Sequence, residues 1–187
     1  MLNVGPRKNG FTLVEVLVVI TIMGILTSMG IASLRKAVVN NRVRDYALNT
    51  AAFLERVAND VNRMSKPLCI KVLPKTIDVY ETSDCSGSSY EQFPIELNLP
   101  LKFGCDIDAN IQELDGMDNG DNWAGNNVVF TPRIGLSPAP KGFVCIQYGS
   151  DNDDGNVYGL AIKSTGKNMI VPKWIPKWDV GNSWQDL

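Results

Sequence analysis

The chain of 187 residues contains no histidine. Histidine is the side chain whose ordinary pKa lies closest to neutral pH, so enzymes commonly use it as a general acid or base. Its absence excludes nucleophiles activated by a Ser-His or Cys-His pair and removes imidazole as a metal ligand. We therefore expect that the protein is not an enzyme and holds no resident cofactor.

Cysteine is scarce, and no two cysteines form a CxxC pair, which argues against a zinc site or a thioredoxin-like redox site. In an oxidising compartment the cysteines would form disulfides instead. Four cysteines can pair in three ways, and spacing does not choose among them. A bond from Cys69 to Cys85 would close a hairpin and leave Cys105 to pair with Cys145, and buried free thiols are the alternative.

Charge is nearly absent from the run between Phe11 and Leu34, where Glu15 is the only ionisable side chain. A membrane-spanning helix needs about 20 predominantly apolar residues, and this run is long enough for one crossing. Two cations precede the run and would hold the N-terminus on the cytoplasmic side. Those cations are Arg7 and Lys8. The run therefore predicts a transmembrane segment over residues 11–34.

A carboxylate inside such a segment usually has a partner and a function. Cleavage between Gly10 and Phe11 would place a new α-amine near Glu15, either in the same chain or in a neighbouring one. The alternative is a glutamate tolerated near the lipid headgroups. A second alternative for the whole segment is an ordinary secretory signal cut near Ala32, although the apolar run is longer than such signals require.

Proline is absent between Phe11 and Lys66, which permits one long helix over this range. From residue 35 to residue 66 the pattern becomes amphipathic with the helical period, so this half is expected to lie on a core. Lys66-Pro67 should end the helix. The apolar stripe comprises Ala47, Ala51, Leu54, Val57, Ala58, Val61 and Met64.

After Pro67 the apolar residues alternate with the period of strands, and turn residues separate the runs. Strands are expected near residues 69–73, 76–80, 93–99, 101–105, 128–130, 142–148, 158–163 and 169–175. Residues 106–127 are rich in Asp, Asn and Gly and predict an irregular acidic loop. The predicted fold class is α+β, with a long N-terminal helix packed on an antiparallel β domain over residues 67–187.

The N-terminal residues resemble a known family. A short basic leader ending in Gly10, followed by Phe-Thr-Leu-Val-Glu and an apolar run, is similar to the signal of type IV pilins and type II secretion pseudopilins. The resemblance implies that a prepilin peptidase removes residues 1–10 and methylates Phe11. It also implies that Glu15 acts in filament assembly. Many members have a proline near the position of Ala32, which this chain lacks.

The second half resembles the GspH/FimT-type minor pilins in patches, through Asn-Val-Val-Phe-Thr-Pro near residue 130, Gly-Phe-Val-Cys-Ile near residue 144 and Ala-Ile-Lys-Ser-Thr-Gly-Lys near residue 164. The resemblance implies a β-sandwich packed on the helix. It also implies a minor-type pilin or pseudopilin that is single-pass in the bacterial inner membrane, with a periplasmic C-terminal domain. The expected partners are membrane lipid, the peptidase and other pilins of a secretion pseudopilus or type IV pilus. A DNA-binding minor pilin for DNA uptake and a major pilin are the alternatives.

Two further patterns suggest ligands. Asp151, Asp153 and Asn156 surround a glycine turn and could hold Ca²⁺, although no glutamate completes the set and a solvated hairpin turn is the simpler interpretation. The stretch between Asp115 and Asn122 is a similar candidate. Cations interleaved with tryptophans near the C-terminus could contact DNA, although these aromatics could instead bury apolar area. The four cations are Lys163, Lys167, Lys173 and Lys177.

Overall fold

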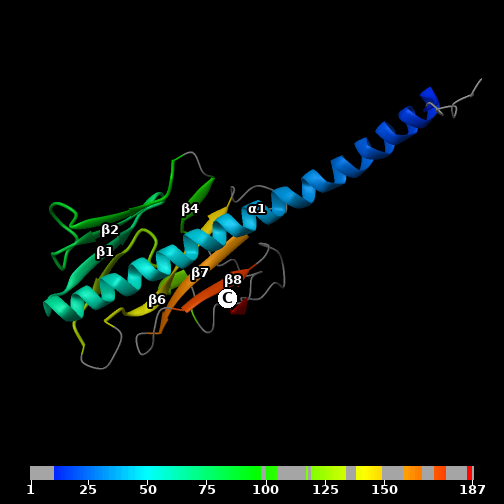
Figure 1. Ribbon diagram of the computed structural model, residues 1–187. Coiled ribbons are helices and arrows are strands. Elements are labelled where there is room, and N and C mark those ends of the chain that lie inside the picture. Colours follow the sequence, from blue (N-terminus) through cyan, green and yellow to red (C-terminus); the bar gives the residue numbers. More distant parts are fainter. Residues whose placement is uncertain are drawn as a thin grey trace, which may run out of the picture. The chain divides into compact units, whose positions relative to one another are not determined.

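The computed structural model describes residues 11–97, 100–104, 117, 119–133, 138–148, 158–165, 171–175 and 185–186. The chain divides into two compact units, Met1–Val38 and Val39–Leu187. The first unit contains the start of helix α1, and the second contains the rest of that helix and every strand (Figure 1). Each unit is described by itself below.

Helix α1 extends from Leu13 to Met64, so it begins two residues later and ends two residues earlier than the predicted range of residues 11–66. Thr12 precedes the first helical residue and caps the helix. At the other end Ser65 has a positive φ of 51°, which takes the backbone out of the helical region. Pro67 follows and lacks the N–H that a further helical turn would need.

In the described part of the chain nine strands follow, and they form two antiparallel sheets. The four-stranded sheet has the order β3-β2-β1-β5, and the five-stranded sheet has the order β4-β6-β7-β8-β9. The strand bounds are β1 Leu68–Val72, β2 Thr76–Tyr80, β3 Glu91–Pro94, β4 Leu101–Phe103, β5 Asn127–Phe130, β6 Lys141–Tyr148, β7 Tyr158–Thr165, β8 Val171–Ile175 and β9 Gln185–Asp186. A short 3₁₀ helix, η1, covers Asn119–Asp121. The predicted α+β class with a helix and an antiparallel β domain is confirmed.

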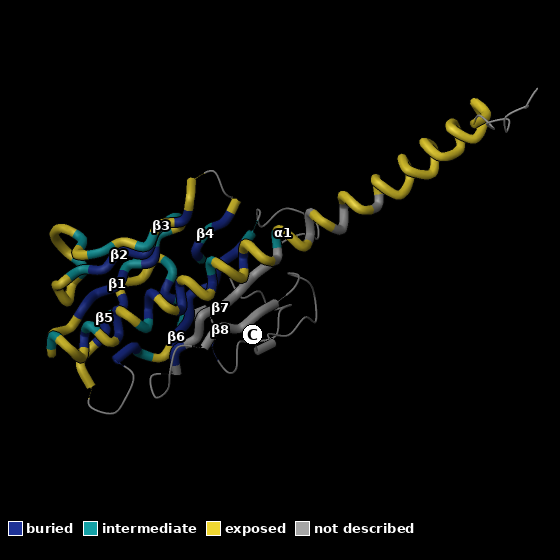
Figure 2. The backbone as a smooth tube through the Cα atoms, viewed as in Figure 1, coloured by how far each residue is buried: buried dark blue, intermediate teal, exposed yellow. Residues whose placement is uncertain are grey.

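One hydrophobic core joins the second half of α1 to both sheets. The predicted helical stripe supplies its inner face, and six of its seven residues are buried, while Met64 is partly buried. Ile70 and Ile77 contribute from the four-stranded sheet, and Val144 and Ile146 contribute from β6. Figure 2 shows these buried positions on α1 and on the central strands. The amphipathic half of the helix is therefore part of the domain's core.

Three aromatic side chains extend this core to the edge of the four-stranded sheet. Phe53 of α1 stacks on Phe93 of β3 with ring centroids 5.1 Å apart. The ring centroid of Phe93 lies 6.3 Å from the ring centroid of Phe103. Phe103 belongs to β4 of the other sheet. Strand β3 begins at Glu91 and ends at Pro94, earlier than predicted at both ends, and the backbone N–H of Ile95 then donates a hydrogen bond of 2.7 Å to the carbonyl of Lys75.

The loop between β2 and β3 is joined covalently to the sheet. A disulfide joins Cys69 of β1 to Cys85 of this loop, as the predicted pairing has it. The side-chain amide of Asn127 on β5 donates a hydrogen bond of 3.3 Å to the backbone oxygen of Asp84. The disulfide therefore attaches the loop to β1, and the hydrogen bond attaches it to β5. Cys145 is also disulfide-bonded, and Cys105, its predicted partner, lies outside the described residues.

Candidate functional site

The first unit presents apolar side chains to its surroundings along the whole start of α1. Phe11 is 86 % exposed and Leu13 is 79 % exposed. Valine, leucine, isoleucine and methionine side chains continue this surface as far as Leu34 (Figure 2). A helix that is hydrophobic all round needs an apolar environment. The segment is therefore incomplete as an isolated structure and requires lipid or protein around it.

Thr12 and Glu15 form a reciprocal cap at the start of this segment. The backbone N–H and the hydroxyl of Thr12 each donate a hydrogen bond of 3.0 Å to Oε2 of Glu15. The backbone N–H of Glu15 donates to the Thr12 hydroxyl oxygen over 3.2 Å. This arrangement is a capping box, which satisfies backbone donors that the first helical turn leaves free. It also fixes the position of the Glu15 carboxylate relative to the helix.

Thr12 was not among the functional residues predicted from the sequence. Its signal was present, because Thr-x-x-Glu immediately before an apolar run is the pattern of a capping box. The sequence instead predicts that Glu15 pairs with the new α-amine of Phe11, either in the same chain or in a neighbouring one. The structure gives one oxygen of Glu15 a local partner, and no hydrogen bond to Oε1 occurs among the described residues.

The other polar side chains of the segment bond within the helix. The hydroxyl of Thr21 donates to the carbonyl of Leu17, and that of Thr27 donates to the carbonyl of Met23, both over 2.7 Å. Ser28 donates in the same way to the carbonyl of Ile25. A hydroxyl that is satisfied by its own backbone costs little in an apolar medium. These residues are therefore compatible with an apolar surrounding.

Within the described part of the chain, no helix reaches the combined length and apolarity that a membrane crossing requires. The transmembrane segment predicted over residues 11–34 stays a prediction.

Several predicted site residues lie outside the described residues. These are Gly10 at the cleavage point, Asp151, Asp153 and Asn156 of the calcium candidate, and Lys167 and Lys177 of the DNA candidate. Lys163 and Lys173 lie on neighbouring strands, where Lys163 pairs with Val171 and Lys173 pairs with Ala161 and Asp186. Calcium and DNA binding therefore stay predictions. Among the described residues, no group of three or more potential metal ligands occurs.

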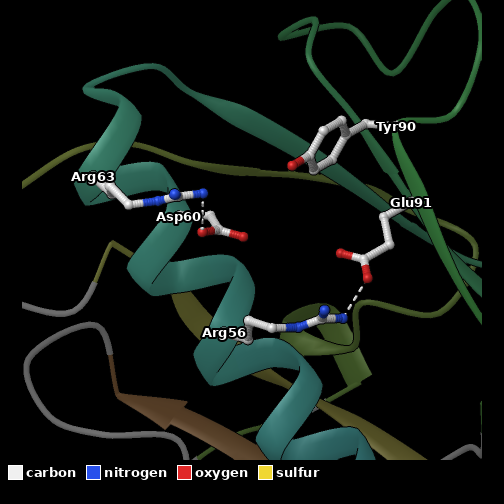
Figure 3. Close-up of a pocket in the computed structure, with 5 residues that line it drawn as sticks. All are labelled: Arg56, Asp60, Arg63, Tyr90 and Glu91. Atoms are coloured by element: carbon white, nitrogen blue, oxygen red, sulfur yellow. Dashed lines mark hydrogen bonds and ion pairs between the residues drawn. The ribbon is translucent and has the colours of Figure 1, made fainter.

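A second surface feature lies where the end of α1 faces the start of β3. Five residues line an open groove of about 600 Å³ there, and Figure 3 shows them. Arg56 forms an ion pair with Glu91 across the groove. Arg63 pairs with Asp60 one helical turn away at 2.9 Å. The fifth residue is Tyr90, and the ring of Phe53 lies 5.4 Å below the Arg56 guanidinium.

Comparison with known proteins gives one match. No curated protein and no solved structure matches the chain significantly. Residues 5–31 match the family described as the prokaryotic N-terminal methylation motif. The matched range includes the predicted cleavage point, the capping box and most of the exposed apolar helix. The N-terminal part of this chain therefore carries the prepilin signal of type IV pilins and pseudopilins.

Proposed function

We propose that the protein is a minor-type pilin or pseudopilin, a structural subunit that polymerises through its N-terminal helix. The methylation motif over residues 5–31 is the observation that carries this proposal. The exposed apolar surface of the first unit supports it, because such a surface must be covered by lipid or by other helices. The minor type is proposed from the resemblance of the second half to GspH/FimT-type pilins.

Processing is the first step of the proposed mechanism. A prepilin peptidase cuts between Gly10 and Phe11 and methylates the new amine of Phe11. The mature segment over residues 11–34 then rests as a single pass in the bacterial inner membrane, with the β domain in the periplasm. The intrahelical bonds of Thr21 and Thr27 make the segment suitable for that environment.

Assembly is the second step. The apolar helix leaves the bilayer and packs against the helices of other pilins, so the filament core replaces lipid as its surroundings. Oε1 of Glu15, which accepts no hydrogen bond from the described residues, is available to the Phe11 amine of a neighbouring subunit. The opposite charges then neutralise each other inside the filament, where an unpaired carboxylate would be unfavourable.

Substitution of Glu15 tests this mechanism and separates its charge from its capping role. Glu15→Gln keeps a side chain that fits a capping box but removes the charge, whereas Glu15→Ala removes both. We expect both variants to be cleaved at Phe11 and both to be lost from sheared filaments. Mass spectrometry of the mature N-terminus and immunoblots of the filament fraction provide the two measurements.

Glu55→Ala is the matched control, because it removes a glutamate from the same helix within the second unit. It should enter filaments normally. Normal incorporation of Glu15→Gln would show that the charge is not the assembly group. A mature N-terminus anywhere other than Phe11 would overturn the proposed function itself.

A further inference from the structure

A group of basic residues follows the exposed apolar run on the same helix. Between residues 35 and 54 the chain has four cations and one carboxylate, that of Asp45. Lysine and arginine normally accumulate on the cytoplasmic side of a membrane segment. The proposed function puts these four cations on the opposite side, so the orientation of the chain does not explain them. The cations are Arg35, Lys36, Arg42 and Arg44.

Arg42 and Arg44 are the members of this group whose side chains the structure describes. Both are exposed, and neither side chain makes an ion pair or a hydrogen bond to a described residue. Arg56 and Arg63, near the end of α1, differ because each pairs with a carboxylate of the same unit (Figure 3). The fold therefore neutralises the distant arginines and leaves the two nearest the apolar run open to an outside partner.

The two open side chains leave the helix on opposite sides. Successive residues of an α-helix are about 100° apart around the axis, so Arg42 and Arg44 are about 200° apart. Val43 lies between them and is fully buried in the core. Two cations placed in this way cannot converge on one small anion. They can both contact a negatively charged surface that surrounds the helix.

Both arginines lie close to the end of the apolar run. The chain between Leu34 and Arg44 is helical, and at a rise of about 1.5 Å per residue Arg42 follows Leu34 by about 12 Å. The headgroup layer on each side of a bilayer is roughly 5–8 Å thick, and the field of a charged surface extends about 8 Å further at physiological salt. When residues 11–34 occupy the hydrocarbon, the two guanidinium groups therefore lie within the field of the headgroups.

We propose that Arg42 and Arg44 form a basic collar that binds the headgroups of anionic phospholipids, a role that rests on the proposed membrane-anchored subunit. Each guanidinium presents a planar fork of N–H donors that matches phosphate oxygens. The collar holds the start of the second unit at the membrane surface until the helix leaves the bilayer. An acidic surface of a neighbouring pilin fits less well, because among the described arginines of α1 the unpaired ones are those next to the predicted membrane segment.

Lipid titration of the full-length chain tests the collar. The protein in a neutral detergent is titrated with anionic phosphatidylglycerol or with zwitterionic phosphatidylcholine of the same acyl chains, and native mass spectrometry counts the bound lipids. The native chain should prefer phosphatidylglycerol. Arg42→Gln with Arg44→Gln should weaken phosphatidylglycerol binding roughly thirtyfold, because each basic residue near an anionic surface contributes a factor of about five. Phosphatidylcholine binding should not change.

Two further variants serve as controls. Arg56→Gln with Arg63→Gln removes two arginines from the same helix, and Arg56 lies about 21 Å further along it than Arg42. This variant should keep the preference for phosphatidylglycerol. Arg42→Lys with Arg44→Lys retains both charges and should keep most of the preference as well. The side chains of Arg42 and Arg44 are exposed, so their replacement removes no core contact.

An unchanged preference for phosphatidylglycerol in Arg42→Gln with Arg44→Gln would overturn the collar, and so would an equal loss in the Arg56 and Arg63 variant. Normal lipid binding combined with loss from filaments would instead assign the two arginines to a contact with another subunit. Mass spectrometry of the same samples reads the N-terminus. A chain cut at Phe11 that shows no preference for anionic lipid leaves the proposed function intact, whereas a chain that is not cut there contradicts the function.

Discussion

Glu15 illustrates how a single residue can serve two purposes with its two oxygens. Oε2 accepts both hydrogen bonds from Thr12 and completes the cap of α1. Oε1 makes no hydrogen bond to the described residues and can accept one from outside the helix. Capping therefore does not compete with the proposed intermolecular role, and it orients the carboxylate for that role.

Gly142 is the residue whose environment most restricts substitution. A Cβ at this position would lie 2.0 Å from Nε1 of Trp123 and 2.7 Å from the backbone oxygen of Asp121, and its φ is +150°. Gly142→Ala should lower the free energy of unfolding by about 2–3 kcal/mol, because a buried indole and backbone must move. Urea unfolding followed by Trp fluorescence measures the change.

Gly87→Ala is the control for this prediction. Gly87 also has a positive φ, of +89°, but nothing lies within 4 Å of the added Cβ. The substitution should cost only the backbone strain, roughly 1 kcal/mol. An equal loss in both variants would mean that the clash with Trp123 is not the cause.

At the scale of elements, the loop between β2 and β3 is more ordered than its Ser-rich sequence indicates. The Cys69–Cys85 disulfide and the bond from Asn127 fix it at two strands. Inside the loop, the Ser86 hydroxyl donates to Oδ1 of Asp84 over 2.8 Å and the Ser86 backbone N–H donates to the same oxygen. Asp84 is thus the centre of the loop's own hydrogen bonds.

This network gives the loop a pH dependence. Hydrogen bonds from Ser86 and Thr82 hold the pKa of Asp84 below its ordinary value of 3.8. A carboxyl whose pKa falls on folding stabilises the protein above the unfolded-state pKa, and this contribution disappears as the pH falls through the folded-state pKa. Asp84→Asn should therefore lower the melting temperature slightly at pH 6, and this deficit should shrink below pH 4.

Ser86→Ala provides the complementary measurement, because it removes the largest cause of the shift. The pKa of Asp84, followed by NMR of its side-chain carboxyl, should rise toward 3.8 in this variant. An unchanged pKa would show that the serine hydroxyl does not determine the titration.

Element types were predictable where one periodicity dominates. The helical stripe from Ala47 to Val61 and the alternation in β1 and β2 correctly indicated a helix on an antiparallel domain. The capping box determines the start of α1, and Ser65 and Pro67 determine its end, so both boundaries have local causes. The order β3-β2-β1-β5 was not predictable, because β5 pairs with β1 across a long intervening stretch of chain and only tertiary packing selects that partner.

The groove could not be predicted for a similar reason. Arg56 and Arg63 lie four and three residues from Asp60 along the helix, and the sequence shows them only as part of a basic stretch. The pairing of Arg56 with Glu91 depends on β3 packing beside the end of α1. By contrast, the prepilin signal was predictable because its residues are contiguous in the sequence.

At the scale of the whole molecule, the two units differ in what they need for stability. Among the described residues, every buried member of the hydrophobic core belongs to the second unit, and the first of them along the chain is Val43. The apolar side chains of the first unit are exposed. The burial that the described residues show therefore lies in the second unit, and the proposed function supplies lipid or other helices to cover the first unit.

A fragment of residues 39–187 should consequently fold on its own. We expect it to melt cooperatively, within a few degrees of the full-length protein, because no core residue is removed. Circular dichroism and differential scanning calorimetry provide the measurement. A fragment of residues 48–187, which lacks Val43 and Ala47, should be clearly less stable, and equal melting of the two fragments would contradict this account.

The intrahelical hydrogen bonds of Thr21, Thr27 and Ser28 affect the free energy of transferring the helix from one environment to another. These hydroxyls have the same partners whatever surrounds the helix, so moving the segment from one apolar medium to another exchanges no hydrogen bonds at these positions. The hydrogen bonding at these three positions is therefore the same in hydrocarbon and in protein. Among the described polar groups of the segment, Oε1 of Glu15 is the one whose hydrogen bonding changes with the surroundings, so the difference between lipid and protein is concentrated at the first helical turn.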